Sequence, residues 1–527
     1  MWNFIFRNQK NKRSTPSVPF ELDYTQTGEN SEISPDILGN ITHLENIFQD
    51  CSDIVFRKLT LGKQQIPAFI IFIQGMADEV IINESIMKSL MELQDTQIET
   101  PITEMIQKSF LQIGHTQEIS LTSDIVEAAL NGETILLVNG ANRGIRIATQ
   151  GMPSRNVSEP TTEAVVRGPK VGFTEDINVN TSLLRKLMKT PQLKMESLAL
   201  GRVTKTKVMI SYLNGTVDDK LVEEVRRRLQ KIDVDSILES GYIEELIEDN
   251  PLSVFPQLQS TERPDKIAAA ILEGRVAILV DGSPFVLVAP STFVQFLHAS
   301  EDYYERYIFS TAVRWIRYLF FLIALFLPGI YVAVTTYHHE MIPTPLLIGI
   351  AGAHEGVPFP SIVEALIMEI TFEALREAGV RLPRPVGQAV SIVGALVIGQ
   401  AAVEAGIVSP GMVIVVALTG IASFTIPSHS LAFSIRVLRF GMLVLAGFMG
   451  LYGILLGLLA LLIHVTSLRS FGIPYLTSLA PFKIQDIKDV LWRAPWWAME
   501  ERPSLIGMNN RSRQKFFQKP RPPKSDQ

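Results

Sequence analysis

A run of 152 residues, from Trp315 to Thr466, carries only 6 basic and 7 acidic side chains, and this scarcity of charge constrains the fold more than any other feature. Four stretches within it lack Asp, Glu, Lys and Arg over lengths that suit a membrane span: 318–337, 386–403, 412–426 and 440–468. About 20 apolar residues cross a hydrocarbon core of about 30 Å. A soluble protein with one buried apolar helix is the alternative, and four such stretches favour an α-helical multi-pass membrane domain instead.

The charges outside this run are unevenly distributed. Residues 1–314 carry 31 basic and 42 acidic side chains, whereas residues 467–527 carry 11 and 5. An acidic head therefore precedes the uncharged region and a basic tail follows it. The chain starts without an apolar signal segment, and Arg306, Arg314 and Arg317 precede the first stretch. The positive-inside rule then predicts a cytosolic head.

A helical pattern starts behind Pro360 and carries a stripe of acids. Glu369, Glu373 and Glu377 are spaced by four residues, so they share one helix face, with Glu364 nearby. Carboxylates close to a bilayer mark an ion path or a pairing network, and these four are the predicted ion-path residues. An interfacial amphipathic helix with a wet face remains the alternative.

Small residues recur every fourth position in the second apolar stretch, at Gly387, Ser391, Ala395 and Gly399. This spacing lets helices approach closely, either within one subunit or between identical subunits.

The number of membrane crossings stays open. Five crossings, with the 342–375 region counted as one, leave the basic tail outside and bring five arginines to the cytosol: Arg376, Arg381, Arg384, Arg436 and Arg439. Four crossings do the reverse, and we favour a cytosolic tail.

The head contains an internal repeat. The segment 69–90 parallels 208–229 with Gln74-Gly75 and Asn214-Gly215 offset by 140, and 124–139 parallels 265–281 with Gly132 and Gly274 offset by 142. Each copy reads as a βα…αββ unit, which predicts two α/β subdomains with mixed sheets. Asn139-Gly140 and Asp281-Gly282 predict hairpin turns. The expected organisation is a disordered 1–40, subdomains 41–150 and 196–300 around a linker 151–195, a membrane domain 301–482 and a basic tail 483–527.

Signatures of common catalytic sites are missing from the sequence. There is no P-loop, HExxH or GxSxG motif, and the one cysteine, Cys51, excludes a disulfide framework and a Cys-rich metal site. His338-His339-Glu340 and His354-Glu355 are better explained by a polar membrane mouth than by a metal site. We therefore predict no catalytic residue, no cofactor, no metal and no nucleic-acid partner.

Several long blocks resemble the A subunit of GerA-type spore germinant receptors. They are 162–187, 273–290, 338–360 (HHEMIPTPLLIGIAGAHEGVPFP), 373–410 and 467–482. The resemblance implies a non-enzymatic protein of the spore inner membrane that works with a transporter-like B subunit and a lipoprotein C subunit. It also implies homo-oligomers that form a nutrient-gated cation channel in contact with membrane lipid. A secondary transporter of a small solute is the competing function, and it would show an inverted repeat among the spans.

Overall fold

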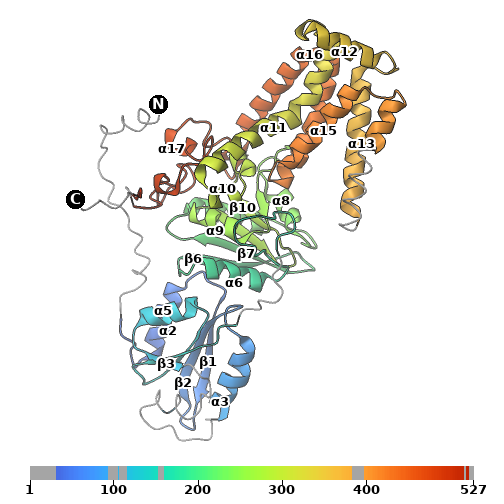
Figure 1. Cartoon of the computed structure of the whole chain (residues 1–527). Coiled ribbons are helices and arrows are strands. Elements are labelled where there is room, and N and C mark those ends of the chain that lie inside the picture. Colours follow the sequence, from blue (N-terminus) through green and yellow to red (C-terminus); the bar gives the residue numbers. More distant parts are fainter. Residues whose placement is uncertain are drawn as a thin grey trace, which may run out of the picture. The chain divides into compact units, whose positions relative to one another are not determined.

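The computed structural model describes residues 31–92, 105, 116–151, 159–382, 397–515 and 518–520. The chain divides into two compact units. One comprises Met1–Ile247, Ser260–Pro290 and Pro495–Gln527 and holds two five-stranded sheets (Figure 1). The other comprises Glu248–Gln259 and Ser291–Ala494 and holds a helix bundle.

The two sheets have the same strand order, which confirms the internal repeat. The first runs β1 (Ile54–Leu61), β2 (Ile66–Ile73), β4 (Thr134–Val138), β5 (Gly144–Ile147), β3 (Thr116–Ile119). The second runs β6 (Leu193–Leu200), β7 (Thr206–Leu213), β9 (Val276–Val280), β10 (Val286–Ala289), β8 (Gln259–Thr261). The Asn-Gly and Asp-Gly pairs lie between β4 and β5 and between β9 and β10, as the hairpin prediction required.

The prediction of mixed sheets is wrong. All four neighbouring pairs of the first sheet are antiparallel, as are β6–β7, β7–β9 and β9–β10 of the second. After β2 the chain forms β3 at the far edge of the sheet. A helix then leads from β3 into β4, which lies beside β2 and runs antiparallel to it. The sequence pattern did not reveal the edge strands β1 and β3, so the direction of β4 was unconstrained.

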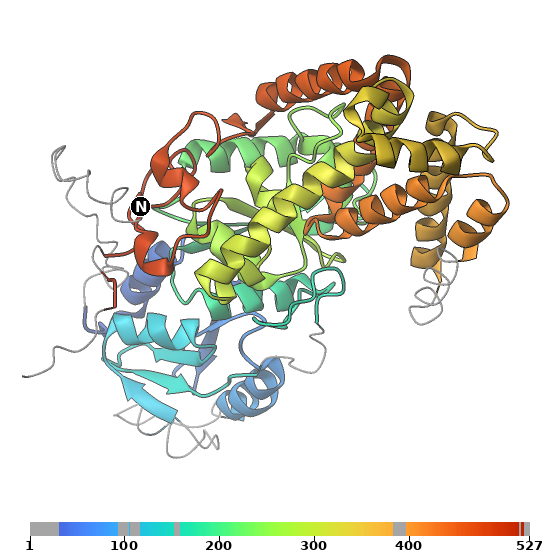
Figure 2. The same ribbon diagram turned by 45° about the horizontal axis from the view of Figure 1, so that its top comes forward.

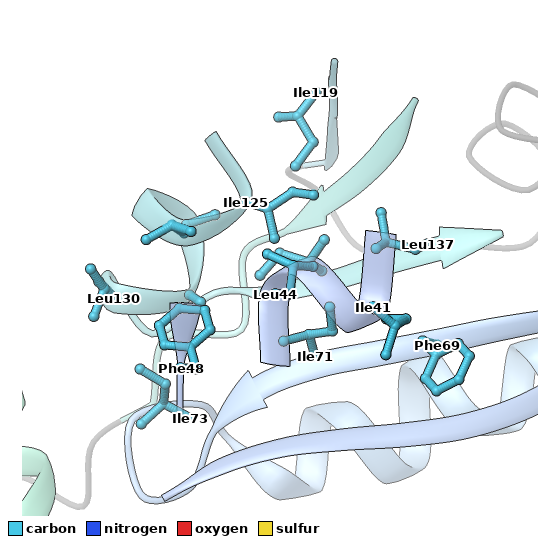
Figure 3. Packing of buried hydrophobic residues seen from close by; sticks show 14 of the residues in the cluster. Ile41, Leu44, Phe48, Phe69, Ile71, Ile73, Ile119, Ile125, Leu130 and Leu137 are labelled. Carbon is cyan, nitrogen blue, oxygen red and sulfur yellow. The ribbon is translucent and has the colours of Figure 1, made fainter. Parts of the chain in front are cut away.

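Helices cover both faces of the first sheet because its central strands bury alternate residues on opposite sides. Phe69, Ile71 and Ile73 pack against α2 (Ile37–Ile47) and α5 (Thr122–Leu130), as Figure 3 shows. Ala68, Ile70 and Phe72 face η1 (Ile81–Met87) and α3 (Lys88–Glu92) on the other side. In the second repeat α6 (Ile177–Leu187) and α9 (Pro264–Leu272) cover one face, and α7 (Asp219–Gln230) lies against β9.

The two repeats also share the start of their first helices, 140 residues apart. Asp36 caps α2 and Asp176 caps α6 through hydrogen bonds from the backbone N–H two residues on. The side-chain amides of Asn40 and Asn180 each hydrogen-bond to the backbone N–H and carbonyl of the residue six positions earlier, in the loop before the cap. These helices start inside the ranges predicted as disordered (1–40) and as linker (151–195), so both repeats begin earlier than expected. Residues 1–30 lie outside the described part of the chain.

A buried ion pair joins the two repeats. Arg185 donates from Nε and Nη2 to the two carboxylate oxygens of Asp53 at 2.7 and 2.9 Å. Arg185 is fully buried and Asp53 is 3% exposed. Burial alone lowers the pKa of Arg185, but the neighbouring Asp53 charge outweighs it and raises that pKa. Beside the pair, Cys51 bridges to Met195 at the start of β6, and burial raises the pKa of its thiol.

The bundle is built around α11 (Tyr307–Thr336) and α16 (His429–Ser467), the two described helices long and apolar enough to cross a membrane. α12 (Thr344–His354), α13 (Ser361–Arg381), a helix over 397–404 and α15 (Pro410–Phe424) lie between them in sequence. Figure 2 shows these helices from a second direction. Shorter elements complete the chain: α8 (Ser240–Ile247), η4 (Phe293–Leu297), α10 (Glu301–Tyr304), η5 (His339–Met341), β11 (Arg469–Ser470), β12 (Ile473–Pro474), α17 (Ile484–Ile487) and η6 (Trp496–Ala498).

α16 is a helical hairpin, which corrects the prediction of one span over 440–468. Gly450 interrupts the helix with φ 59° and ψ −142°, a conformation that favours glycine. A Cβ on Gly457 would lie 2.5 Å from Met442 Sδ. In a continuous helix, 15 residues of separation would place these positions about 22 Å apart at 1.5 Å per residue. The chain therefore folds back at Gly450 into two arms packed through glycines.

The close packing of the two arms predicts that a side chain at Gly453 destabilises the bundle, whereas one at Gly441 does not. A Cβ there would collide with the carbonyl oxygen of Leu445 in the opposite arm. Gly453→Ala is expected to destabilise the bundle by about 1–3 kcal/mol, because overpacking displaces backbone. Gly441→Ala is the matched control, since a Cβ at Gly441 meets nothing within 4 Å. Denaturant unfolding of the purified chain in detergent measures both, and equal stabilities would contradict the hairpin.

The basic tail folds onto the second repeat. Arg502 is buried and donates to the Leu272 carbonyl at the end of α9 at 2.6 Å. Arg513 pairs with Glu273 at 2.8 Å, and the Asn509 side chain donates to the Val217 carbonyl at 2.6 Å. Residues 495–513 of the tail are thus part of the same compact unit as the head.

Candidate functional site

α13 holds the four predicted ion-path residues in three different environments. Glu364 and Glu369 are almost completely buried, Glu373 is partly buried, and the Glu377 side chain is 64% exposed. A single solvated stripe would expose all of them equally. The helix instead turns the first three carboxylates toward specific partners on neighbouring elements.

Glu369 and Glu373 form an ion-pair cluster with the first arm of α16. Arg439 Nη2 lies 3.0 Å from a carboxylate oxygen of each of them. Arg436 donates to Glu373 at 3.0 Å. Arg439 and Glu369 are each 1% exposed, so this contact is shielded from water. The cluster joins α13 to α16 across more than 60 residues of sequence.

Arg376 extends the cluster to α15. Its Nη1 lies 3.6 Å from Glu373, and its Nη2 donates to the Ser423 hydroxyl at 2.8 Å. The guanidinium also lies over the rings of Phe424 and Phe372, at 4.7 and 5.3 Å from their centroids. Three arginines thus face two carboxylates in the described structure, so the cluster carries more positive than negative charge.

Glu377 and Glu364 lie outside this cluster, near opposite ends of α13. Glu377 pairs with Arg381 one turn later in an exposed i,i+4 contact, and such pairs hold carboxylates weakly. Glu364 accepts the backbone N–H of Ser409 at 2.7 Å and faces His354 at the end of α12. α12, α13 and α15 therefore meet at Glu364.

Of the predicted helix-packing residues, Gly399 falls in the helix over 397–404. A Cβ on it would contact Val413 of α15 at 3.4 Å. Gly387, Ser391 and Ala395 lie outside the described residues. The proposed role of this series in packing or oligomerisation stays a prediction.

The start of α11 holds a second buried ion cluster, which the sequence analysis missed. Arg317 donates to both carboxylate oxygens of Asp302 at 2.8 and 3.0 Å, and Arg314 donates to one of them at 3.2 Å. Arg314 also pairs with Asp489, at 3.0 Å. Arg314 and Arg317 were expected to be basic residues before a span, and both are instead buried within α11. Asp489 follows α16, so the chain enters and leaves the bundle at one end.

The segment 248–259 packs into that same end. The Phe255 ring lies 6.3 Å from Phe293, 6.0 Å from His464 and 6.5 Å from Tyr475, measured between centroids. The Pro256 carbonyl accepts the Tyr475 hydroxyl at 2.7 Å. Burial raises the pKa of Tyr475 well above its usual range. This segment is joined through the chain to head residues on both sides, so it is a covalent link between the sheets and the bundle.

The described residues contain no group of three or more His, Cys, Asp and Glu side chains arranged to hold a metal ion. His338, one of the residues considered for such a site, instead accepts the Leu451 N–H at 3.4 Å. It therefore caps the second arm of α16 beside the Gly450 turn.

Known proteins resemble the chain over both units. It is 49% identical over 92% of its length to "Uncharacterized membrane protein YfkQ" of Bacillus subtilis (strain 168), covering 94% of that protein. It is 47% identical over 93% of its length to "Spore germination protein KA" of the same organism, covering 90% of it. With "Spore germination protein GerLA" of Bacillus cereus the identity is 41%, over 86% of this chain and 92% of the relative.

A solved structure covers part of the chain. It is described as the N-terminal domain of the A subunit of the Bacillus megaterium spore germinant receptor GerK3, with 36% identity and a TM-score of 0.41 over 51% of this chain and all of that domain. The profile described as "Bacillus/Clostridium GerA spore germination protein" matches residues 42–505, which include both sheets and the whole bundle. The chain therefore belongs to the GerA family of spore germination proteins.

Proposed function

We propose that the chain is the membrane subunit of a nutrient germinant receptor and that several copies form a nutrient-gated cation channel in the spore inner membrane. The observation that carries this proposal is the family match, which extends without a break from the head through the bundle. A transporter-like B subunit would recognise the nutrient, and a lipoprotein C subunit would complete the receptor. Nutrient binding would then bias the bundle between closed and open states.

Exposed apolar side chains support insertion into lipid. Phe448 is 75% exposed, Ile463 is 69% exposed and Ile414 is 68% exposed. The core helix of a soluble protein buries such side chains, whereas a bilayer solvates them. The proposed environment of α11, α15 and α16 is therefore lipid or another membrane subunit.

Two contacts support an even number of crossings. The tail belongs to the same unit as the head, and Asp489 after α16 pairs with Arg314 at the start of α11. The count of five crossings treats 440–468 as one span, and the second arm of α16 adds a sixth. Six crossings leave head and tail together on the cytosolic side.

The carboxylates of α13 are proposed to border the ion path, with Glu377 as the one least committed to a partner. Glu377→Gln is expected to reduce nutrient-triggered cation release several-fold, because a negative charge at the entrance of the proposed ion path raises the local cation concentration. Potassium release from spores, normalised to receptor level, measures this effect. Glu223→Gln, at an exposed acid of α7, is the control. Unchanged release at normal receptor level would remove Glu377 from the ion path.

A secondary transporter is the alternative, because the bundle has broken apolar helices that could surround a solute. The two functions differ in what crosses the membrane. Proteoliposomes containing the purified chain should not accumulate labelled nutrient if it is a channel subunit. Saturable nutrient uptake by the chain alone would favour the transporter.

A further inference from the structure

At the junction of α12, α13 and α15 a partly exposed histidine faces a fully buried glutamate. His354 Nε2 lies 3.3 Å from Glu364 Oε1. Glu364 is fully buried, and its second oxygen, Oε2, accepts the Ser409 N–H at 2.7 Å. Neither His354 Nε2 nor Glu364 Oε1 has a hydrogen-bond partner elsewhere in the described structure. The two atoms therefore depend on each other.

The other nitrogen of the imidazole defines where the protons are. His354 Nδ1 lies 2.9 Å from the Ile350 carbonyl oxygen, which can only accept a hydrogen bond. Nδ1 therefore carries a hydrogen, and in a neutral ring Nε2 presents a lone pair to Glu364. Facing lone pairs repel, and burying an unsatisfied carboxylate is costly. One proton between Nε2 and Oε1 removes both penalties, whether it belongs formally to the histidine or to the glutamate.

This contact is the main polar attachment of α12. The structure describes no buried residue on α12, and its Leu346 and Ile348 are 56% and 67% exposed. α15 contributes no titratable side chain. The other carboxylates of α13 have partners of their own: Glu369 and Glu373 pair with Arg439, and Glu377 pairs with Arg381. Nearby, Glu355 follows α12, Glu404 accepts a hydrogen bond from Gln400, and the Tyr331 hydroxyl of α11 lies against Gly411. None of these groups hydrogen-bonds to His354 Nε2 or Glu364 Oε1 in the described structure, so the pair is the site that binds the proton.

We propose that His354 and Glu364 form a binding site for one shared proton and that this proton latches α12 to α13 and α15. Glu364 is also one of the α13 carboxylates proposed to border the ion path, but the latch is tested without measuring ion flux. When α12 detaches, water solvates both groups and they no longer need to share a proton. The latched pair therefore holds a proton that the detached pair can release, so the latched state weakens as pH rises, by up to about tenfold per pH unit.

Hydrogen exchange of the full chain in lipid nanodiscs tests the latch. Protection factors for residues 344–354, corrected for intrinsic exchange, are measured from pH 5 to 9. Protection in the wild type should fall as pH rises across this range, by up to about tenfold per pH unit. Glu364→Gln should make protection independent of pH, because the amide donates to His354 Nε2 and its oxygen still accepts from Ser409.

His339→Gln and Glu340→Gln, at exposed residues of η5, are the matched controls and should retain the wild-type pH dependence. Constant protection in the wild type would overturn the latch without any variant. The same would follow if Glu364→Gln kept the wild-type pH profile. A wild-type profile that follows the concentration of sodium or potassium instead of pH would replace the proton by a metal cation.

Discussion

Replacing Arg439 by methionine is expected to lower the free energy of unfolding of the helix bundle by about 3–5 kcal/mol, the usual effect of stranding one member of a buried ion pair. Arg439 lies 3.0 Å from both Glu369 and Glu373 and is 1% exposed. Its loss leaves the carboxylate of Glu369 buried with no cation in contact among the described residues. Methionine preserves most of the apolar side-chain volume, so the effect reports charge rather than a cavity.

The matched control is Arg381→Met on the partner helix of the same cluster. Arg381 pairs with Glu377, and the two side chains are 78% and 64% exposed. Loss of an exposed i,i+4 pair is expected to change stability by less than about 1 kcal/mol. The double variant Arg439→Met with Glu369→Gln should recover part of the loss, because residue 369 then carries no buried charge. Equal effects of Arg439→Met and Arg381→Met in denaturant unfolding would show that the cluster is not buried.

The second large effect is expected between the repeats of the head. Arg185→Met should destabilise the packing of the two sheets by about 3–5 kcal/mol, because Asp53 would remain buried without its bidentate partner. Hydrogen exchange of the full chain resolves this loss locally. Protection should fall in β1 and β6, because Cys51, just before β1, bridges to Met195 of β6, while the helix bundle keeps its protection.

Arg202 and Asp233 offer the same chemistry on the surface. They also form a two-point arginine–aspartate contact, but their side chains are 63% and 67% exposed. Arg202→Met is expected to change stability by less than about 1 kcal/mol. Protection in β1 and β6 that survives Arg185→Met would mean that the repeats are held together by other contacts.

Local sequence patterns were sufficient to find the repeat but not its edges. The offsets of 140 and 142 residues aligned β2 with β7 and the α5–β4–β5 unit with its counterpart. They missed α2 and α6, because Asp36 and Asp176 each cap a helix whose apolar residues are interspersed with polar ones. The edge strands β1 and β6 carry charged residues, exposed in β1 and buried or partly buried in β6, and these interrupt the alternation of apolar residues.

The acid stripe was predicted from spacing, whereas its partners depend on tertiary structure. Four-residue intervals place Glu369 and Glu373 on one face of α13, and the structure confirms that both turn to the same arm of α16. Arg436 and Arg439 are more than 60 residues away in sequence, and nothing local links them to α13. The turn at Gly450 was missed for a different reason: a glycine inside an apolar run leaves no polar signal of a break.

Recording of single-channel currents from the assembled receptor in a planar bilayer tests the central proposal most directly. We expect cation-selective unitary currents to appear when nutrient is added to the chain assembled with its B and C partners. The Glu377→Gln variant should reduce their amplitude. Assembled receptor that binds nutrient but carries no current at any nutrient concentration would contradict the account.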